Sequence, residues 1–229
     1  MEVRYKHVVA LTPRDVDLLT FCALHKGAPV GVVARRFFAT HPTTGEPNKD
    51  PDHACRRRLK ELVALGFLEP IAARGDRRIA AVTAKAAAAL GVAKRDTVAL
   101  KGRAHHVATL TYLQDLTERY AAQGVKVLNI RLEFQLRSDL QAGHRTRKGD
   151  AFDAFPDAVF ELERPTTDGS MDREEHALEY VTQKYSDRDI IDKAESFTPR
   201  YDSVVWVADK KTTAKRLSAL TGRPSEVWA

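Results

Sequence analysis

The chain has 229 residues, 43% of them hydrophobic, with 37 Lys and Arg against 31 Asp and Glu. This size and composition favour two compact domains, each with its own core. No apolar run is long enough to span a bilayer and no signal peptide follows Met1, so we expect a cytoplasmic protein with no membrane partner. Cys22 and Cys55 fall on apolar helix faces, and no further Cys or clustered His completes a zinc set.

The basic charge is concentrated in the first half of the chain. Residues 1–105 carry 19 Lys and Arg against 10 Asp and Glu, whereas residues 106–229 carry 18 against 21. Such asymmetry points to a polyanionic partner for the first half and a different role for the second.

The first half begins with two predicted helices. Thr12 and Asp15 form a capping-box pattern, which predicts a helix over 13–26. A second short helix is expected over 29–40. A polar loop containing Pro and Gly, residues 41–49, then leads to a third helix.

The third helix is the most informative element of the chain. Asp50 is placed to cap it, Pro51 to open it and Gly66 to end it, which predicts a helix over 51–65. One face of it is apolar and the other is basic. The residues after it predict a hairpin with strands 67–73 and 78–82 and a basic turn at 74–77, followed by a helix over 84–90.

This order of elements is that of a winged helix-turn-helix, which we assign to residues 1–91, and its expected partner is double-stranded DNA. Lys and Arg that neutralise phosphates supply most non-specific affinity. The alternative is a solvated charged surface, which is the usual role of a charge run. The predicted DNA-binding residues here are His53, Arg56, Arg57, Arg58, Lys60, Arg74, Arg77 and Arg78.

The second half alternates strands with helices after a linker at 92–105. A helix over 106–122 precedes a strand over 125–136, and a polar loop follows. This order predicts an α/β domain over 106–229. The later elements expected are strands 157–162, 176–181 and 203–208 and helices 187–197 and 212–220.

Three acids stand at or within these predicted strands. Glu133 lies in the first, Asp157 opens the second and Glu179 lies in the third. Carboxylates that converge from adjacent strands are hard ligands for Mg²⁺, which activates water for phosphodiester hydrolysis. The alternative is that these acids point outward to solvent.

The same three acids resemble the motif of the PD-(D/E)xK, or restriction-endonuclease-like, nucleases. The whole chain is similar to the plasmid replication-relaxation family, which joins a winged helix-turn-helix to such a domain. The resemblance implies a catalytic lysine two residues after Glu179, but Val181 occupies that position. Lys184 or Lys193 could supply the charge, or the domain has lost activity and serves as a scaffold. Whether the chain is an enzyme therefore stays open, with Mg²⁺ as the cofactor if it is active.

The loop over 138–150 is the last candidate for DNA contact, through Arg145, Arg147 and Lys148, and the alternative is a plain surface loop. The leading hypothesis is a double-stranded DNA-binding, nucleoid-associated protein, expected to be a homodimer. Its setting would be plasmid, phage or chromosome replication or maintenance, or transcription control. The alternatives are a Mg²⁺-dependent endonuclease guided by its first domain, and a protein-interaction module.

Overall fold

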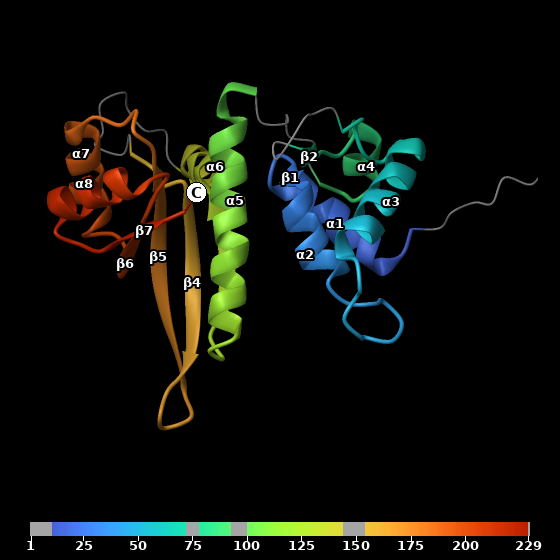
Figure 1. Ribbon diagram of the computed structural model, residues 1–229, viewed down its shortest axis with the longest axis horizontal. Helices are drawn as coiled ribbons and strands as arrows, with labels where there is room; N and C mark the ends of the chain where they lie inside the picture. The colour runs from blue at the N-terminus through green and yellow to red at the C-terminus, as the bar shows by residue number, and fades with distance from the viewer. Residues whose placement is uncertain (1–10, 72–77, 93–99, 144–153, 229) are drawn as a thin grey trace, which may run out of the picture. The chain divides into compact units, whose positions relative to one another are not determined.

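The structure, a computed structural model, describes residues 11–71, 78–92, 100–143 and 154–228. The chain forms two compact units, Met1–Thr111 and Tyr112–Ala229. The boundary falls within helix α5, Leu100–Ala121, which begins six residues before the predicted position. Part of the predicted linker 92–105 is therefore helical. Figure 1 shows the elements of both units along the chain.

Unit 1 contains four short helices and two short strands in its described residues, besides the start of α5. The capping signals read from the sequence are confirmed: Thr12 and Asp15 form a capping box, and Asp50 accepts a hydrogen bond from the His53 amide at 2.9 Å. The elements are α1 Pro13–Leu24, β1 Ala28–Pro29, α2 Val30–Phe38, α3 Pro51–Ala64, β2 Ile79–Ala80 and α4 Ala84–Ala89.

The segment after α3 pairs with the returning segment, but the predicted strands 67–73 and 78–82 do not form over those lengths. The described residues have an isolated bridge between Leu68 and Val82 and the two-residue strand β2. The Glu69 amide donates to the Ala81 carbonyl at 2.8 Å, and the Thr83 amide donates to the Phe67 carbonyl at 3.0 Å. On its other side the returning segment pairs antiparallel with β1. The predicted turn 74–77 lies outside the described residues, so only the base of the hairpin can be compared with the prediction.

Unit 2 is built on a five-stranded mixed sheet of order β3-β4-β5-β6-β7. The first three strands pair antiparallel, and β5, β6 and β7 pair parallel. Its elements after α5 are β3 Lys126–Leu132, α6 Glu133–Gly143, β4 Ala158–Pro165, β5 Met171–Val181, α7 Asp187–Phe197, β6 Ser203–Ala208, α8 Lys211–Thr221 and β7 Ser225–Val227. The expected mixture of helices and strands is thus confirmed.

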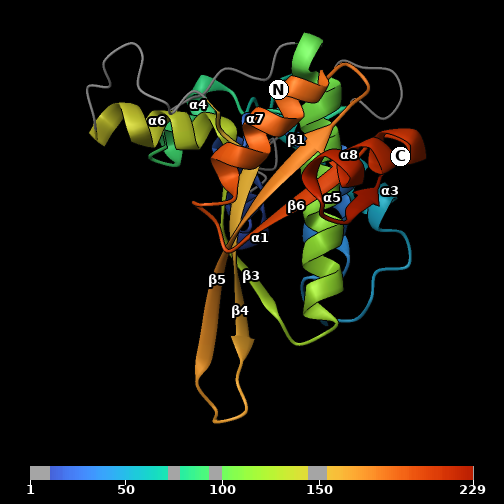
Figure 2. The ribbon, with the colours of Figure 1, turned by 90° about the vertical axis from the view of Figure 1, so that its left-hand side faces the viewer.

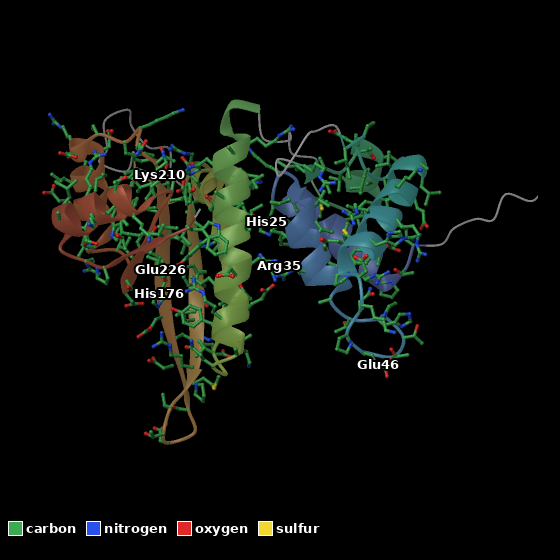
Figure 3. All side chains as sticks on the ribbon, in the orientation of Figure 1. His25, Arg35, Glu46, His176, Lys210 and Glu226 are labelled. Atoms are coloured by element: carbon green, nitrogen blue, oxygen red, sulfur yellow. The ribbon has the colours of Figure 1, made fainter. Side chains whose placement is uncertain are left out.

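Helices cover both faces of this sheet. Figures 1 and 2 show α7 and α8 on one side, and on the other the part of α5 that belongs to this unit. Trp206 is the largest fully buried side chain on the α7 side, where it stacks near Phe197. On the α5 side Tyr112 packs edge-on against Trp228, and Arg119 forms an ion pair with Glu226 at 3.0 Å, the latter labelled in Figure 3.

Two predicted boundaries in this unit are wrong by four residues or more. The strand expected over 125–136 ends at Leu132, and Glu133 opens helix α6. The Leu132 amide donates to the Gln135 side chain at 2.8 Å, a local contact that stops the strand. Strand β5 begins at Met171, five residues before the predicted start, and its charged first half is paired with β4. Strand β7 was not predicted.

Within the described ranges, no helix combines the length and the apolar character that crossing a membrane requires.

Candidate functional site

Helix α3 separates an apolar face from a basic one. Cys55, Leu59 and Leu62 are fully buried against α1, α2 and α4 in the core of unit 1. Four of the basic side chains predicted to contact DNA point the other way and are exposed to solvent: His53, Arg56, Arg57 and Lys60. The burial of one face therefore fixes which side chains the helix presents.

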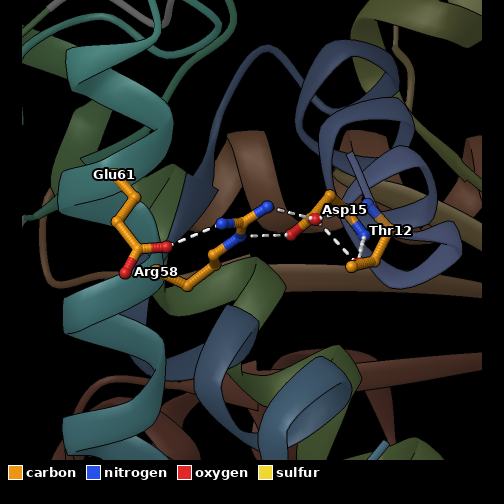
Figure 4. Close-up of polar contacts among 4 residues, drawn as sticks. All are labelled: Thr12, Asp15, Arg58 and Glu61. Atoms are coloured by element: carbon orange, nitrogen blue, oxygen red, sulfur yellow. Dashed lines mark hydrogen bonds and ion pairs between the residues drawn. The ribbon is translucent and has the colours of Figure 1, made fainter. Parts of the chain in front are cut away.

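Arg58 belongs to the same basic run but has a different environment. Its guanidinium donates to both carboxylate oxygens of Asp15, at 2.9 and 2.6 Å, and to Glu61 at 2.6 Å (Figure 4). Its side chain is only 12% exposed, and that of Asp15 is 0% exposed. Arg58 thus ties α3 to α1 inside the fold, with Thr12 also donating to Asp15.

The electrostatics of this pair favour both charged forms. Burial alone would raise the pKa of Asp15, but the hydrogen bonds from Arg58 and Thr12 outweigh it and hold the pKa below its usual value. The hydrogen bond to Asp15 is also the main cause that raises the pKa of Arg58. The guanidinium is therefore committed to internal partners.

Two hollows flank the exposed face of α3. One, of about 320 Å³, lies between α3, the start of α2 and the base of the hairpin, and Arg56, Lys60 and Arg78 line it. The other, of about 380 Å³, lies beside the loop that precedes α3, where Lys49 and Arg57 contribute positive charge. The basic face is thus continuous with recesses on both sides, and Lys49, which lines the second recess, was not among the predicted residues.

Five predicted DNA-binding residues cannot be placed. Arg74 and Arg77 lie in the segment 72–77, and Arg145, Arg147 and Lys148 lie in the segment 144–153, both outside the described residues.

In unit 2 the structure brings Asp157 and Glu179 together. Asp157 lies directly before β4, and its carboxylate accepts a hydrogen bond from the Tyr180 amide at 2.7 Å. Glu179 is completely buried in β5 and forms an ion pair with Lys193 of α7. Of the two lysines that the sequence left open, Lys193 reaches the acid, while Lys184 is exposed in the turn before α7.

Glu179 has a strongly perturbed pKa. Burial and, next, the negative charge of Asp157 raise the pKa of Glu179 to about 8, although Lys193 opposes both effects. Burial also raises the pKa of Tyr185, and the charge of Glu179 adds to this. The second carboxylate oxygen of Glu179, Oε2, is buried and accepts no hydrogen bond from the described residues. A buried oxygen without a hydrogen-bond donor destabilises the folded state unless a bound ligand or ion interacts with it.

Glu133 lies close to this site, where its negative charge is one of the smaller causes that raise the pKa of Tyr185. The Glu133 amide donates to the Asp157 carbonyl at 3.0 Å, but its carboxylate is paired with Arg137 at 2.7 Å, one turn along α6. The i, i+4 spacing of Glu133 and Arg137 is a signal that the sequence analysis missed. Among the described residues, no three His, Cys, Asp or Glu side chains are grouped so that they could hold a metal ion.

Two carboxylates nevertheless suit a hard cation. Mg²⁺ usually keeps several waters and binds proteins through one or two carboxylates. Asp157 and Glu179 would hold the ion. The Oε2 atom of Glu179 accepts no hydrogen bond from a described residue, so it would be available as a ligand. Such an ion would supply Lewis-acid stabilisation of phosphate oxygens and an activated water. Lys193 would place a positive charge beside the same acids.

Comparison of the chain with protein-family models, with curated proteins and with solved structures gave no significant match.

Proposed function

We propose that the chain binds double-stranded DNA through the exposed basic face of α3. The observation that carries the proposal is that Arg56, Arg57 and Lys60 are exposed, while the opposite face of the helix is fully buried. None of the three forms an ion pair with a described residue. Arg58 has internal partners, so we assign it to the fold and not to the interface.

The cations of unit 2 give a useful contrast. Several of them are neutralised by acids of the same unit, so they carry little net attraction for a polyanion. The ion pairs include Arg119 with Glu226, Arg131 with Glu175, Arg173 with Glu163 and Arg216 with Asp187. The uncompensated positive charge of α3 therefore favours this helix as the element that approaches phosphate.

The geometry of α3 suits the major groove, which admits an α-helix and displays the base edges. Arg56 and Lys60 are one turn apart and Arg57 lies beside them, so the three form one patch. The resemblance to the plasmid replication-relaxation family supports a role in replication or maintenance of plasmid, phage or chromosomal DNA. Nucleoid association and a homodimer are parts of this proposal, and sedimentation of the free and DNA-bound chain tests the dimer.

Fluorescence anisotropy with a labelled 30-base-pair duplex tests the proposal. We expect the triple variant Arg56→Ala/Arg57→Ala/Lys60→Ala to weaken binding by at least 30-fold at low salt. The matched control removes Lys184, Lys211 and Lys215, three exposed lysines of unit 2, and should leave the affinity within twofold. Equal losses in the two variants would assign the attraction to net charge and refute the role of α3.

A second candidate function is metal-dependent cleavage of DNA. The specific observation that favours it is the buried group of Asp157, Glu179 and Lys193, in which a carboxylate oxygen lacks a partner among the described residues. Burial of two acids beside a lysine is unfavourable for a plain scaffold, and residues with a strongly raised pKa, such as Glu179, cluster at functional sites. Lys193 would stabilise negative charge that develops on a phosphate bound there.

Incubation with supercoiled plasmid, in Mg²⁺, in Mn²⁺ and in chelator, tests this candidate. Metal-dependent nicking that disappears in Asp157→Ala/Glu179→Ala, and in Lys193→Met, would make the chain a nuclease. As a control, the binding of the labelled duplex is measured for each of these variants. A variant that still binds but does not nick has lost cleavage and not binding. Binding without nicking under every condition would leave unit 2 as a scaffold.

A further inference from the structure

The hollow beside the hairpin combines two kinds of surface. Its volume of about 320 Å³ is at the lower end of the range for small-molecule pockets, roughly 300–1,000 Å³. The floor is apolar and is formed by α2, α3 and the hairpin base, through Val30, Leu59, Val63, Pro70 and Ile71.

The remaining lining residues are cationic. Arg56 and Lys60 approach from α3, and Arg78 from the returning side of the hairpin. None of the three forms an ion pair with a described residue, and none of the described lining residues is acidic. Three positive charges that no described residue neutralises, around an apolar floor, match a ligand with a negatively charged head and a hydrocarbon body.

The phosphates of DNA alone do not account for both features. A phosphodiester is satisfied by the cations, and it makes no use of an apolar floor. The cavity therefore suits a ligand that carries an apolar group as well as an anion, and its volume of about 320 Å³ limits that group to a chain of medium length or a single ring.

We propose that this cavity binds a small amphipathic organic anion of the medium-chain carboxylate class, with the carboxylate between Arg56, Lys60 and Arg78 and the chain on the apolar floor. Two of these cations lie on the face that α3 presents to DNA. Occupation of the cavity consequently competes with duplex binding, a consequence that rests on the function proposed above.

Isothermal titration calorimetry of the full chain with octanoate tests the site. Each buried methylene adds up to about fourfold in affinity, so butanoate should bind much more weakly than octanoate. Octanol, which lacks the charge, and inorganic phosphate, which lacks the chain, should both bind at least tenfold more weakly. Octanol or phosphate binding as tightly as octanoate would overturn the proposal.

Two arginine variants locate the ligand. Arg78→Ala should weaken octanoate at least fivefold, because it removes a rim cation without altering α3. Arg57→Ala should leave octanoate affinity within twofold, because Arg57 lines the other hollow. Equal effects of the two variants would place octanoate elsewhere and refute the assignment.

The competition arm separates this proposal from the DNA proposal. Octanoate at ten times its dissociation constant should raise the apparent dissociation constant of the duplex about 11-fold. Octanoate binding by a chain that binds no DNA would support the cavity and refute the proposed function, and DNA binding without octanoate binding would do the reverse. If both bind without competing, the assignment to this cavity is wrong.

Discussion

The neighbouring residues Arg57 and Arg58 should have opposite roles, which a pair of methionine substitutions can separate. Arg58→Met removes one partner of a buried ion pair and leaves the Asp15 carboxylate with Thr12 alone. Arg57→Met makes the same substitution at an arginine whose side chain is exposed. We expect the first variant to destabilise unit 1 and the second to weaken DNA binding.

The magnitude follows from burial. Removing one partner of a buried ion pair typically costs about 3–5 kcal/mol. Arg58 keeps 12% of its side-chain exposure and Thr12 still donates to Asp15, which favours the lower end, about 3 kcal/mol. For Arg57, an exposed residue with no described partner, the change in stability should stay within about 0.5 kcal/mol.

Backbone hydrogen exchange measures the effect where it should occur. A loss of about 3 kcal/mol accelerates exchange through global opening of unit 1 by about 150-fold in α1 and α3. Amides of β5 provide the internal reference, since they belong to unit 2. The double variant Asp15→Asn/Arg58→Met should recover at least half of the loss, because no charge is then left buried.

The pair also has a pH signature. Because the pKa of Asp15 is lowered in the folded state, its contribution is fully present above its ordinary value of 3.8 and is lost as the pH falls through the folded value. The advantage of the wild type over Arg58→Met should therefore shrink below about pH 4. Similar exchange rates in Arg57→Met and Arg58→Met, or an advantage independent of pH, would refute the reasoning.

Two further predictions concern stability. Lys193→Met should destabilise unit 2 by up to about 3 kcal/mol at a pH above about 8, where Glu179 is ionised and would be left buried without its cation. Adding Glu179→Gln should recover most of that loss. Urea denaturation followed by tryptophan fluorescence checks this, with Lys184→Met as the control, and a Lys193→Met curve that overlays the control at that pH would contradict it. Gly27→Ala should cost more than 2 kcal/mol, since its φ is +94° and a methyl group there would overlap the Ile79 side chain. Gly31→Ala, with open space in α2, should instead stabilise by about 0.5 kcal/mol, and thermal melts that rank the two variants the other way would be inconsistent with the structure.

Local signals predicted much of the fold. Capping residues placed the starts of α1, α3 and α4 correctly, because a side-chain oxygen that bonds a free amide is a nearest-neighbour effect. The predicted helix 187–197 and strand 203–208 match the structure at both ends. These elements have strong apolar periodicity and clear turns on either side.

The errors arose where contacts are not local. The charged first half of β5 has no strand pattern in the sequence. It forms a strand because it pairs with β4, where Glu163 makes an ion pair with Arg173 of β5 at 2.7 Å. Glu133 was assigned to a strand because the strand pattern continues past Leu132 in the sequence. What ends β3 is the hydrogen bond from the Leu132 amide to the Gln135 side chain, which the pattern does not show. Such pairings become visible only when the strands are brought together.

The candidate sites show the same limit. Helical periodicity separates the two faces of α3, yet it does not reveal that Asp15, 43 residues earlier in the chain, binds Arg58. The sequence likewise left Lys184 and Lys193 as equal candidates for the cation beside Glu179. Only the packing of α7 against β5 distinguishes them.

The most direct test of DNA binding through α3 is the salt dependence of duplex affinity. For the wild type, the logarithm of the binding constant should fall linearly with the logarithm of salt concentration, by about 0.9 for each phosphate neutralised. Arg56→Ala/Arg57→Ala/Lys60→Ala should reduce that slope by roughly 2 to 3 units. An unchanged slope in the variant, or a wild-type affinity independent of salt, would contradict the account.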